Sequence, residues 1–273
     1  MDANDFLEEV EKLIINQGTD QRNLILIDPY GYKNINKKNI EKLLSSKRNT
    51  EIILFLPVSQ IYRFTGKVLN EVDTNVKALK DFIESFFPKR SHPIYNKSMS
   101  HEKDLIEYIR EALTFHDEFF ATSYFIQRDK REHYYALFSI MPNIYGLEKN
   151  LAVKWKLNEE SGEGFEQPKA FVGLFDDQFK QAAIQEQYNK LKDLLLEFIE
   201  MKGKVNNNQL YEFTLKSMFL PKHSNIVLKQ LQNDEVIEVV DANTKGKAKC
   251  GAFYQNYTNY KSDNIKIIIR KTK

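Results

Sequence analysis

Two short apolar runs with a helical stretch between them restrict the fold more than any other feature of this sequence. The runs are residues 23–27 and 51–57, and residues 39–44 between them carry apolar side chains at helical spacing. Continuous runs of this length are typical of strands that are buried on both faces of a parallel sheet. A strand, a helix and a second strand within so few residues predict a right-handed βαβ unit, and therefore an α/β protein. In such sheets, ligands bind just beyond the carboxyl ends of the strands, which here are residues 28–32 and 57–63.

The following part of the chain continues the alternation of helices and strands. Apolar spacing predicts several helices, and two apolar runs joined by a polar turn predict a hairpin. The predicted helices span 6–15, 72–87, 102–116 and 146–156, and the hairpin strands span 119–127 and 133–141. A domain takes roughly 100–200 residues, so a chain of 273 residues predicts more than one. We expect an α/β domain over residues 1–176, a connecting helix over 177–202 and a second domain over 203–273.

The second domain has the element order of a winged helix. Two short predicted helices are separated by Leu220 and Pro221, and a strand, a turn and a closing strand follow. These elements span 209–217, 222–233, 236–240, 243–249 and 265–269. Residues 204–273 hold eleven lysines and one arginine against six acids, a net charge of about +6, whereas the whole chain carries only +2. The basic charge is therefore concentrated in this domain.

The numbers and positions of cysteine and histidine narrow the classes of function. Cys250 is the only cysteine, which excludes an internal disulfide and a four-thiolate zinc site. The five histidines show no metal-ligand spacing and no serine lies in a G-x-S-x-G turn, so we expect no metal and no nucleophilic catalysis. The N-terminus is acidic, and no run approaches the roughly 20 apolar residues of a membrane span. These features predict a soluble, cytoplasmic protein that has no membrane partner.

The turn Asp28-Pro29-Tyr30-Gly31 is the sharpest local motif. It is similar to the segment of adenine amino-methyltransferases in which a strand ends in an acid or amide, followed by two prolines and an aromatic residue. There the acid and a neighbouring carbonyl orient the target amine, and the ring stacks on the extruded base. Asp28, Pro29 and Tyr30 or Tyr32 match these roles, although the second proline is replaced. The alternative interpretation is a plain tight turn after a strand, with proline second and glycine fourth.

Further segments in the same order along the chain extend this likeness to one family. They are residues 134–138 with 146–149 and 155–156, residues 158–165, and residues 219–223 with the strand that follows. Together with residues 28–32, they make the chain resemble the three-Cys-motif partner proteins from about residue 20 to the end. Members of that family look like class I methyltransferases fused to a winged helix. The resemblance therefore implies a partial Rossmann-like, methyltransferase-type sheet with flanking helices, followed by a C-terminal winged-helix domain.

One departure from the family pattern concerns the methyl donor. The family's glycine-rich donor loop precedes the segment that this chain matches, and none of the ten glycines here forms such a turn between a strand and a helix. We therefore expect a degenerate or N-terminally truncated methyltransferase-like domain that alone is inactive and takes no cofactor. If the loop were supplied in trans, S-adenosylmethionine would be the cofactor, and Asp28, Pro29 and Tyr30 would serve amino-methyl transfer to nucleic acid. The resemblance also implies a protein partner and an origin on a mobile element.

The predicted winged helix offers a surface for DNA or RNA, between which the sequence does not choose. Its second helix would enter the groove and its wing would reach the backbone, with lysines at alternate positions on one face of the ribbon. The candidate binding residues are Lys222, Asn225, Lys229, Lys245, Lys247 and Lys249, with Gln230 beside them and Tyr254, Tyr257 and Tyr260 nearby. The same pattern is compatible with two alternatives. The winged helix would recruit a partner protein in a non-enzymatic adaptor, or the chain would be a transcriptional regulator that binds one DNA site as a symmetric dimer.

Overall fold

The structure is a computed structural model of the 273-residue chain, and it describes residues 3–16, 18, 21–29, 32, 35–46, 49–68, 77–96, 99–127, 134–165 and 176–272. The chain divides into two compact units. The N-terminal unit comprises residues 1–150 and 163–170, and the C-terminal unit comprises residues 151–162 and 171–273. The boundary falls within helix α6 (Ile144–Leu157), which therefore contributes to both cores.

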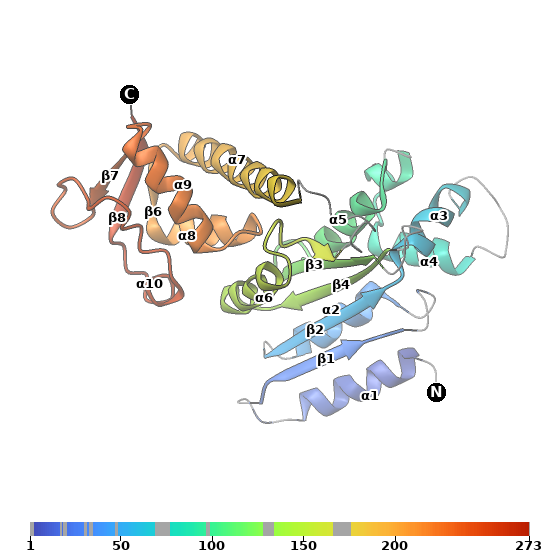
Figure 1. The fold of residues 1–273 in the computed structure, drawn as a ribbon. Coiled ribbons are helices and arrows are strands. Elements are labelled where there is room, and N and C mark those ends of the chain that lie inside the picture. The colour runs from blue at the N-terminus through green and yellow to red at the C-terminus, as the bar shows by residue number, and fades with distance from the viewer. Residues whose placement is uncertain are drawn as a thin grey trace. The chain divides into compact units, whose positions relative to one another are not determined.

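The N-terminal unit is built on a five-stranded sheet in the order β1-β2-β4-β3-β5 (Figure 1). The strands are β1 (Asn23–Ile27), β2 (Thr50–Leu56), β3 (Phe120–Gln127), β4 (Tyr134–Met141) and β5 (Gly164–Phe165). β1 and β2 are parallel, as the βαβ pattern predicts. β4 is antiparallel to both β2 and β3, which confirms the predicted hairpin and makes the sheet mixed rather than wholly parallel.

Helices pack on this sheet, and one of them, over residues 58–68, was not predicted from the sequence. They are α1 (Ala3–Ile15), α2 (Lys37–Ser46), α3 (Val58–Val68), α4 (Lys77–Phe86), the 3-10 helix η2 (Pro93–Asn96), α5 (Glu102–Ala112) and the first half of α6. Residues 57–63, which follow the carboxyl end of β2, lie largely in a helix, because α3 begins at Val58, two residues after β2 ends. Val58, Ile61 and Thr65 are fully or almost fully buried at helical spacing. These three side chains therefore form the face of the helix that packs into the core.

The two faces of the sheet differ in burial. On β2 the even-numbered side chains from Thr50 to Leu56 are buried, and the odd-numbered ones are half-buried. Because strand side chains alternate between faces, one face lies on the core and the other is only partly covered. On β1, Leu24 and Leu26 are 67% and 66% exposed, although β1 is the edge strand beside a parallel neighbour. A parallel strand is normally covered on both faces, so this exposure is unusual.

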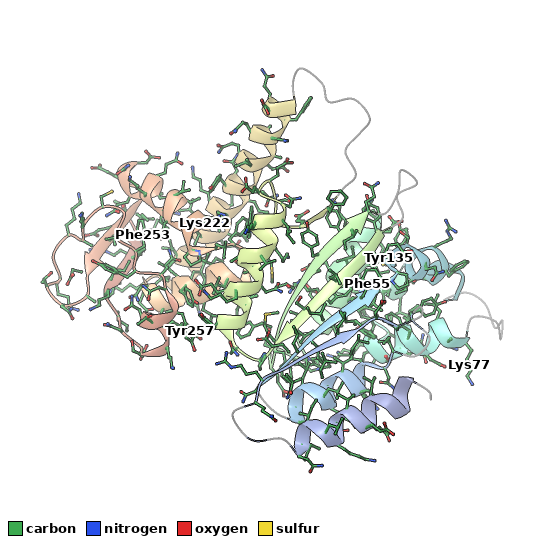
Figure 2. The ribbon with its side chains drawn as sticks, turned by 60° about the horizontal axis from the view of Figure 1, so that its bottom comes forward. Phe55, Lys77, Tyr135, Lys222, Phe253 and Tyr257 are labelled. Atoms are coloured by element: carbon green, nitrogen blue, oxygen red, sulfur yellow. The ribbon has the colours of Figure 1, made fainter. Side chains whose placement is uncertain are left out.

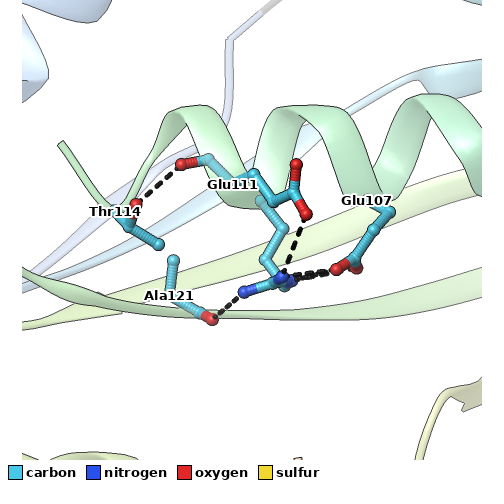
Figure 3. Close-up of polar contacts among 5 residues, drawn as sticks. Glu107, Glu111, Thr114 and Ala121 are labelled. Atoms are coloured by element: carbon cyan, nitrogen blue, oxygen red, sulfur yellow. Dashed lines mark hydrogen bonds and ion pairs between the residues drawn. The ribbon is translucent and has the colours of Figure 1, made fainter. Parts of the chain in front are cut away.

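Arg110 on α5 holds that helix against β3 (Figure 3). Its Nη1 donates to the carbonyl oxygen of Ala121 at 3.4 Å, and its Nε donates to both carboxylate oxygens of Glu107 at 2.9 Å. Burial alone would lower the pKa of Arg110, but the hydrogen bonds and charges of Glu107 and Glu111 raise it overall. The guanidinium therefore stays charged and links helix to strand.

The C-terminal unit has the topology of a winged helix. Its sheet has the order β6-β8-β7 and is antiparallel throughout. The elements are α7 (Asp176–Lys202), β6 (Val205–Asn206), α8 (Asn207–Lys216), α9 (Pro221–Asn233), β7 (Ile237–Asp241), α10 (Tyr257–Lys261) and β8 (Ile267–Lys271). Helix α7, expected as a connecting helix, packs against α9 and β8 inside this unit, with Leu191, Leu195 and Ile199 fully buried. None of the described helices of the chain is both long and apolar enough to cross a membrane.

Trp155, from the second half of α6, lies in the core of the C-terminal unit and is 6% exposed. Its Nε1 donates to the carbonyl oxygen of Met218 at 2.9 Å, and its ring centroid lies 4.2 Å from that of His223. Gly162 closes over the indole with φ +66°, and a Cβ there would lie 2.9 Å from the ring. Only glycine fits this position, because it combines a left-handed backbone with a close approach to the indole.

Candidate nucleic-acid interface

The first sequence-predicted site lies at the carboxyl end of β1. Asp28 is exposed there, and among the described residues its carboxylate has neither a hydrogen bond nor an ion pair. Pro29 is half-buried, and Tyr30 lies outside the described residues. Tyr32 packs edge-on against Phe82, with ring centroids 5.9 Å apart, and burial raises the pKa of its phenol. The half-buried ring of Tyr32 therefore packs on the core through this contact.

The described glycines do not form a cradle for a methyl donor near Asp28. Gly146 follows β4 and lies in the first turn of α6, but a Cβ there would meet Glu51 Oε1 at 3.0 Å and Met141 Cβ at 3.2 Å. Its small size therefore lets α6 pack closely on the sheet. Glu51 lies at the start of β2, so Gly146 is at the opposite end of the strands from Asp28. Gly146 therefore serves helix packing, away from the end of the sheet where Asp28 lies.

The second predicted site is the solvent face of α9. Lys222, Ile226, Lys229 and Gln230 are exposed, whereas residues such as Val227, Leu228 and Leu231 on the opposite face are buried. The helix contains no acidic residue. Within the described part of the chain, neither Lys222 nor Lys229 forms an ion pair. Figure 2 labels Lys222 near the start of this helix. The exposed face of α9 thus carries unneutralised positive charge.

Several acids of the C-terminal unit are neutralised by other cations. Glu212 pairs with Lys216 at 2.8 Å, and Glu200 pairs with Lys271 at 3.0 Å. Glu238 on β7 pairs with Arg270 on β8 at 2.7 Å, and the hydrogen bond from Arg270 lowers the pKa of the Glu238 carboxyl. These pairs lie on α7, α8 and the β-sheet and not on α9. Among the described residues, these acids therefore do not neutralise the lysines of α9.

The wing lysines are exposed, but they do not form the regular ribbon that alternation predicts. Only Lys247 lies in a ladder, as the partner of Val240 on β7. Lys245 sits in the preceding turn with φ +59°, and its Nζ donates to the carbonyl oxygen of Ala242 at 2.6 Å. Lys249 lies after the ladder and is exposed. The prediction that one strand face presents all three lysines is wrong, because the hairpin tip ends the strand geometry at Asp241.

Residues 249–255, which we call the strap, run along α9 instead of leading directly into the closing strand. Cys250 Sγ hydrogen-bonds Asn233 Oδ1 at 3.1 Å, and the backbone N–H of Gly251 donates to Gln232 Oε1 at 3.2 Å. Further along, Gln255 Nε2 donates to Asn225 Oδ1 at 3.0 Å. The strap therefore follows α9 from its last turn back to its first. It covers the flank of the helix that carries Asn225.

Gln255 is the buried hydrogen-bond centre of this arrangement, with 6% of its surface exposed. Its Oε1 accepts hydrogen bonds from Thr214 Oγ1 on α8 at 3.1 Å and from Ser224 Oγ on α9 at 3.0 Å. With the bond to Asn225, one side chain ties the strap to both helices. Asn225, which the sequence predicts to read nucleic acid, is thus engaged within the protein. No local pattern in the sequence points to Gln255, because glutamine in a polar stretch is typical of a surface.

Comparison with known proteins supports the fold of this unit. Residues 162–244 match the family model described as the GMT-like wHTH domain. The C-terminal unit therefore contains a winged-helix domain, a class that is compatible with nucleic-acid binding or regulation. No curated protein and no solved structure matches the chain.

The described residues also bear on metal binding. In those parts of the chain, no three His, Cys, Asp or Glu side chains come together as a metal site requires. His223, the histidine closest to the interface, is 7% exposed, and its Nδ1 accepts a hydrogen bond from the backbone N–H of Leu220 at 3.2 Å. Burial, with a smaller contribution from the charge of Lys222, lowers its pKa to about 4. His223 is therefore a neutral core residue at the start of α9.

Proposed function

We propose that the C-terminal winged helix binds nucleic acid, with the solvent face of α9 and the wing lysines neutralising phosphates. The observation that carries this proposal is the acid-free face of α9, where Lys222 and Lys229 have no ion pair among the described residues. The exposed Lys247 and Lys249 extend the positive charge onto the wing. Lysines that bind phosphate release condensed counterions, so affinity must fall steeply with salt.

The test is a fluorescence-anisotropy titration of the full chain with a labelled DNA duplex over a series of salt concentrations. Each phosphate contact contributes a slope of about −0.9 to the dependence of log affinity on log salt. Lys222→Ala combined with Lys229→Ala should weaken binding and reduce the slope by about 2. Lys190→Ala is the matched control, because Lys190 is an exposed lysine on α7 of the same unit. An undetectable affinity for both duplex and single-stranded DNA and RNA at low salt would overturn the proposal.

We further propose that the N-terminal unit is a degenerate methyltransferase-like domain of the three-Cys-motif partner type, in a nucleic-acid-associated protein. Its support is the βαβ unit whose first strand is followed by the exposed Asp28 and by Pro29, at the edge where α/β sheets bind ligands. Methyl transfer would require S-adenosylmethionine and a donor loop from elsewhere. Because the described glycines do not fit the donor, calorimetric titration of the chain with S-adenosylmethionine should give no heat of binding. Micromolar binding would instead indicate an active domain, and Asp28→Ala should then abolish activity.

A second candidate function, a protein-binding adaptor, is favoured by one specific observation. Leu24 and Leu26 expose two thirds of their surface on the edge strand β1. Phe55 and Tyr135 on the same partly covered face stack in parallel, with ring centroids 5.3 Å apart (Figure 2). Exposed strand edges with apolar side chains commonly receive a strand from another polypeptide. The salt titration separates the two candidates, because an adaptor predicts no affinity for nucleic acid.

A further inference from the structure

Tyr254 in the strap has a backbone conformation that bulky residues rarely adopt. Its φ is +51°, and its side chain is 45% exposed. The residues on either side point inward, since Phe253 is 1% exposed and Gln255 is 6% exposed. Asn259 Nδ2 donates to the Tyr254 carbonyl oxygen at 3.0 Å and fixes the turn. Two buried anchors and one hydrogen bond therefore hold the backbone in the left-handed region and direct the ring outward.

Burial of the ring does not compensate for this conformation. Phe115 also has a positive φ, at +47°, but it is 3% exposed and packs edge-on against Phe119 at 5.8 Å. Its packing offsets the cost of the backbone. Tyr254 obtains no comparable burial. Other turns also hold an exposed residue with positive φ, such as Glu235, but at Tyr254 the side chain directed outward is an aromatic ring, which fits a binding role.

One cation of α9 lies against the strap that carries Tyr254, because the Cδ of Lys229 would be 3.6 Å from a Cβ at Gly251. The amide of Gln255, next to Tyr254, binds Asn225 on α9. Lys222 and Lys229 lie three residues before and four residues after Asn225, so both are its neighbours on the helix surface. Lys249 belongs to the strap itself. An aromatic ring beside several lysines is the arrangement by which proteins bind bases and backbone together.

We propose that Tyr254 stacks on an unpaired nucleobase while the lysines of α9 and the strap neutralise the flanking phosphates. This inference rests on the nucleic-acid binding proposed above and specifies its substrate as a strand with at least one unstacked base. The bases inside a continuous duplex have both faces covered, whereas an overhang, a bulge or a single strand offers a free face. The hydroxyl of Tyr254 has no required part in this contact.

The first test compares ring variants of the full chain. The probe is a DNA duplex with one unpaired 2-aminopurine, alongside a fully paired duplex of equal length and an RNA version of each. Tyr254→Phe keeps the aromatic face and should bind the unpaired probe within about twofold of the unsubstituted chain. Tyr254→Leu keeps apolar bulk without a π face and should lose about 5- to 100-fold. Binding should also quench the 2-aminopurine of the unpaired probe, and the RNA arm shows which sugar is accepted.

The second test changes the residue that adopts the left-handed backbone conformation. Tyr254→Gly relieves the left-handed conformation, so the thermal midpoint of the C-terminal unit should rise while affinity for the unpaired probe falls. Glu235→Gly is the matched control, because Glu235 is exposed with φ +58° and lies outside the strap. It should raise the midpoint with no loss of affinity. A purely structural Tyr254 would not give opposite changes in stability and affinity.

The possible outcomes separate this inference from the proposed function. If the unsubstituted chain binds none of the probes at low salt, the winged helix does not bind nucleic acid and both proposals fail. If it binds them and Tyr254→Leu binds as tightly as the unsubstituted chain, only the stacking role is overturned. The stacking role is also overturned if Tyr254→Phe loses as much affinity as Tyr254→Leu, because the hydroxyl would then carry the contact.

Discussion

At the scale of single residues, His223 makes the stability of the C-terminal unit depend on pH. Its pKa is about 4 in the folded protein, against an ordinary value of 6.5. The folded state therefore binds the proton less readily than the unfolded state. Above about pH 6.5 both states are neutral and the stability is fully present. As the pH falls from there towards 4, only the unfolded chain gains the proton, so stability is lost.

The predicted loss between about pH 7 and about pH 5 is roughly 1–2 kcal/mol. Urea unfolding followed by the fluorescence of Trp155 measures it, because Trp155 is the only tryptophan and lies 4.2 Å from His223 between ring centroids. His223→Gln keeps a hydrogen-bond acceptor without a titrating group, so its stability should be nearly constant over the same range. An equally steep pH dependence in His223→Gln would assign the effect to other residues.

At the scale of elements, the two faces of the short strand β1 should differ in the substitutions that they tolerate. Leu24 and Leu26 are mostly exposed, whereas Ile27 is 9% exposed. We predict that Leu24→Lys combined with Leu26→Lys changes the free energy of unfolding by less than about 1 kcal/mol. The same variant should bind less of an apolar-surface dye and scatter less light at high concentration, because charge on an edge strand opposes association. Ile27→Lys is the matched control and should unfold the N-terminal unit, since it buries a charge.

The periodic elements were predictable, and the strap was not. The runs at residues 23–27 and 51–57 form β1 and β2 in parallel, as their apolar patterns predict. The expected burial of both strand faces is wrong for β1, where Leu24 and Leu26 are exposed. The strap anchors itself with Phe253 and Gln255, and a buried glutamine gives no apolar pattern to detect. Only the excess of positive charge in the C-terminal part of the sequence indicated the lysines of α9 as a binding surface. The engagement of Asn225 depends on Gln255, 30 residues away, which local spacing cannot indicate.

At the scale of the whole molecule, the two units are expected to unfold separately. One hydrophobic cluster is made of residues between Leu7 and Ile140, and Trp155 reports only on the C-terminal unit. Leu54→Ala should cost about 2–5 kcal/mol in the N-terminal core, because Leu54 is fully buried on β2. The loss should appear in the circular dichroism of the chain but leave the transition of Trp155 fluorescence in place.

Leu228→Ala on α9 is the reciprocal variant and should shift the Trp155 transition, since Leu228 is fully buried within the C-terminal unit. Helix α6 is continuous from Ile144 to Leu157, and the boundary between the units falls within it. It is therefore the element through which unfolding of one unit would be coupled to unfolding of the other. If Leu54→Ala moves the Trp155 transition as far as Leu228→Ala does, α6 couples the cores into a single cooperative structure. If the transitions are separate, a ligand of the winged helix should stabilise that unit alone, by mass action on its own folding equilibrium.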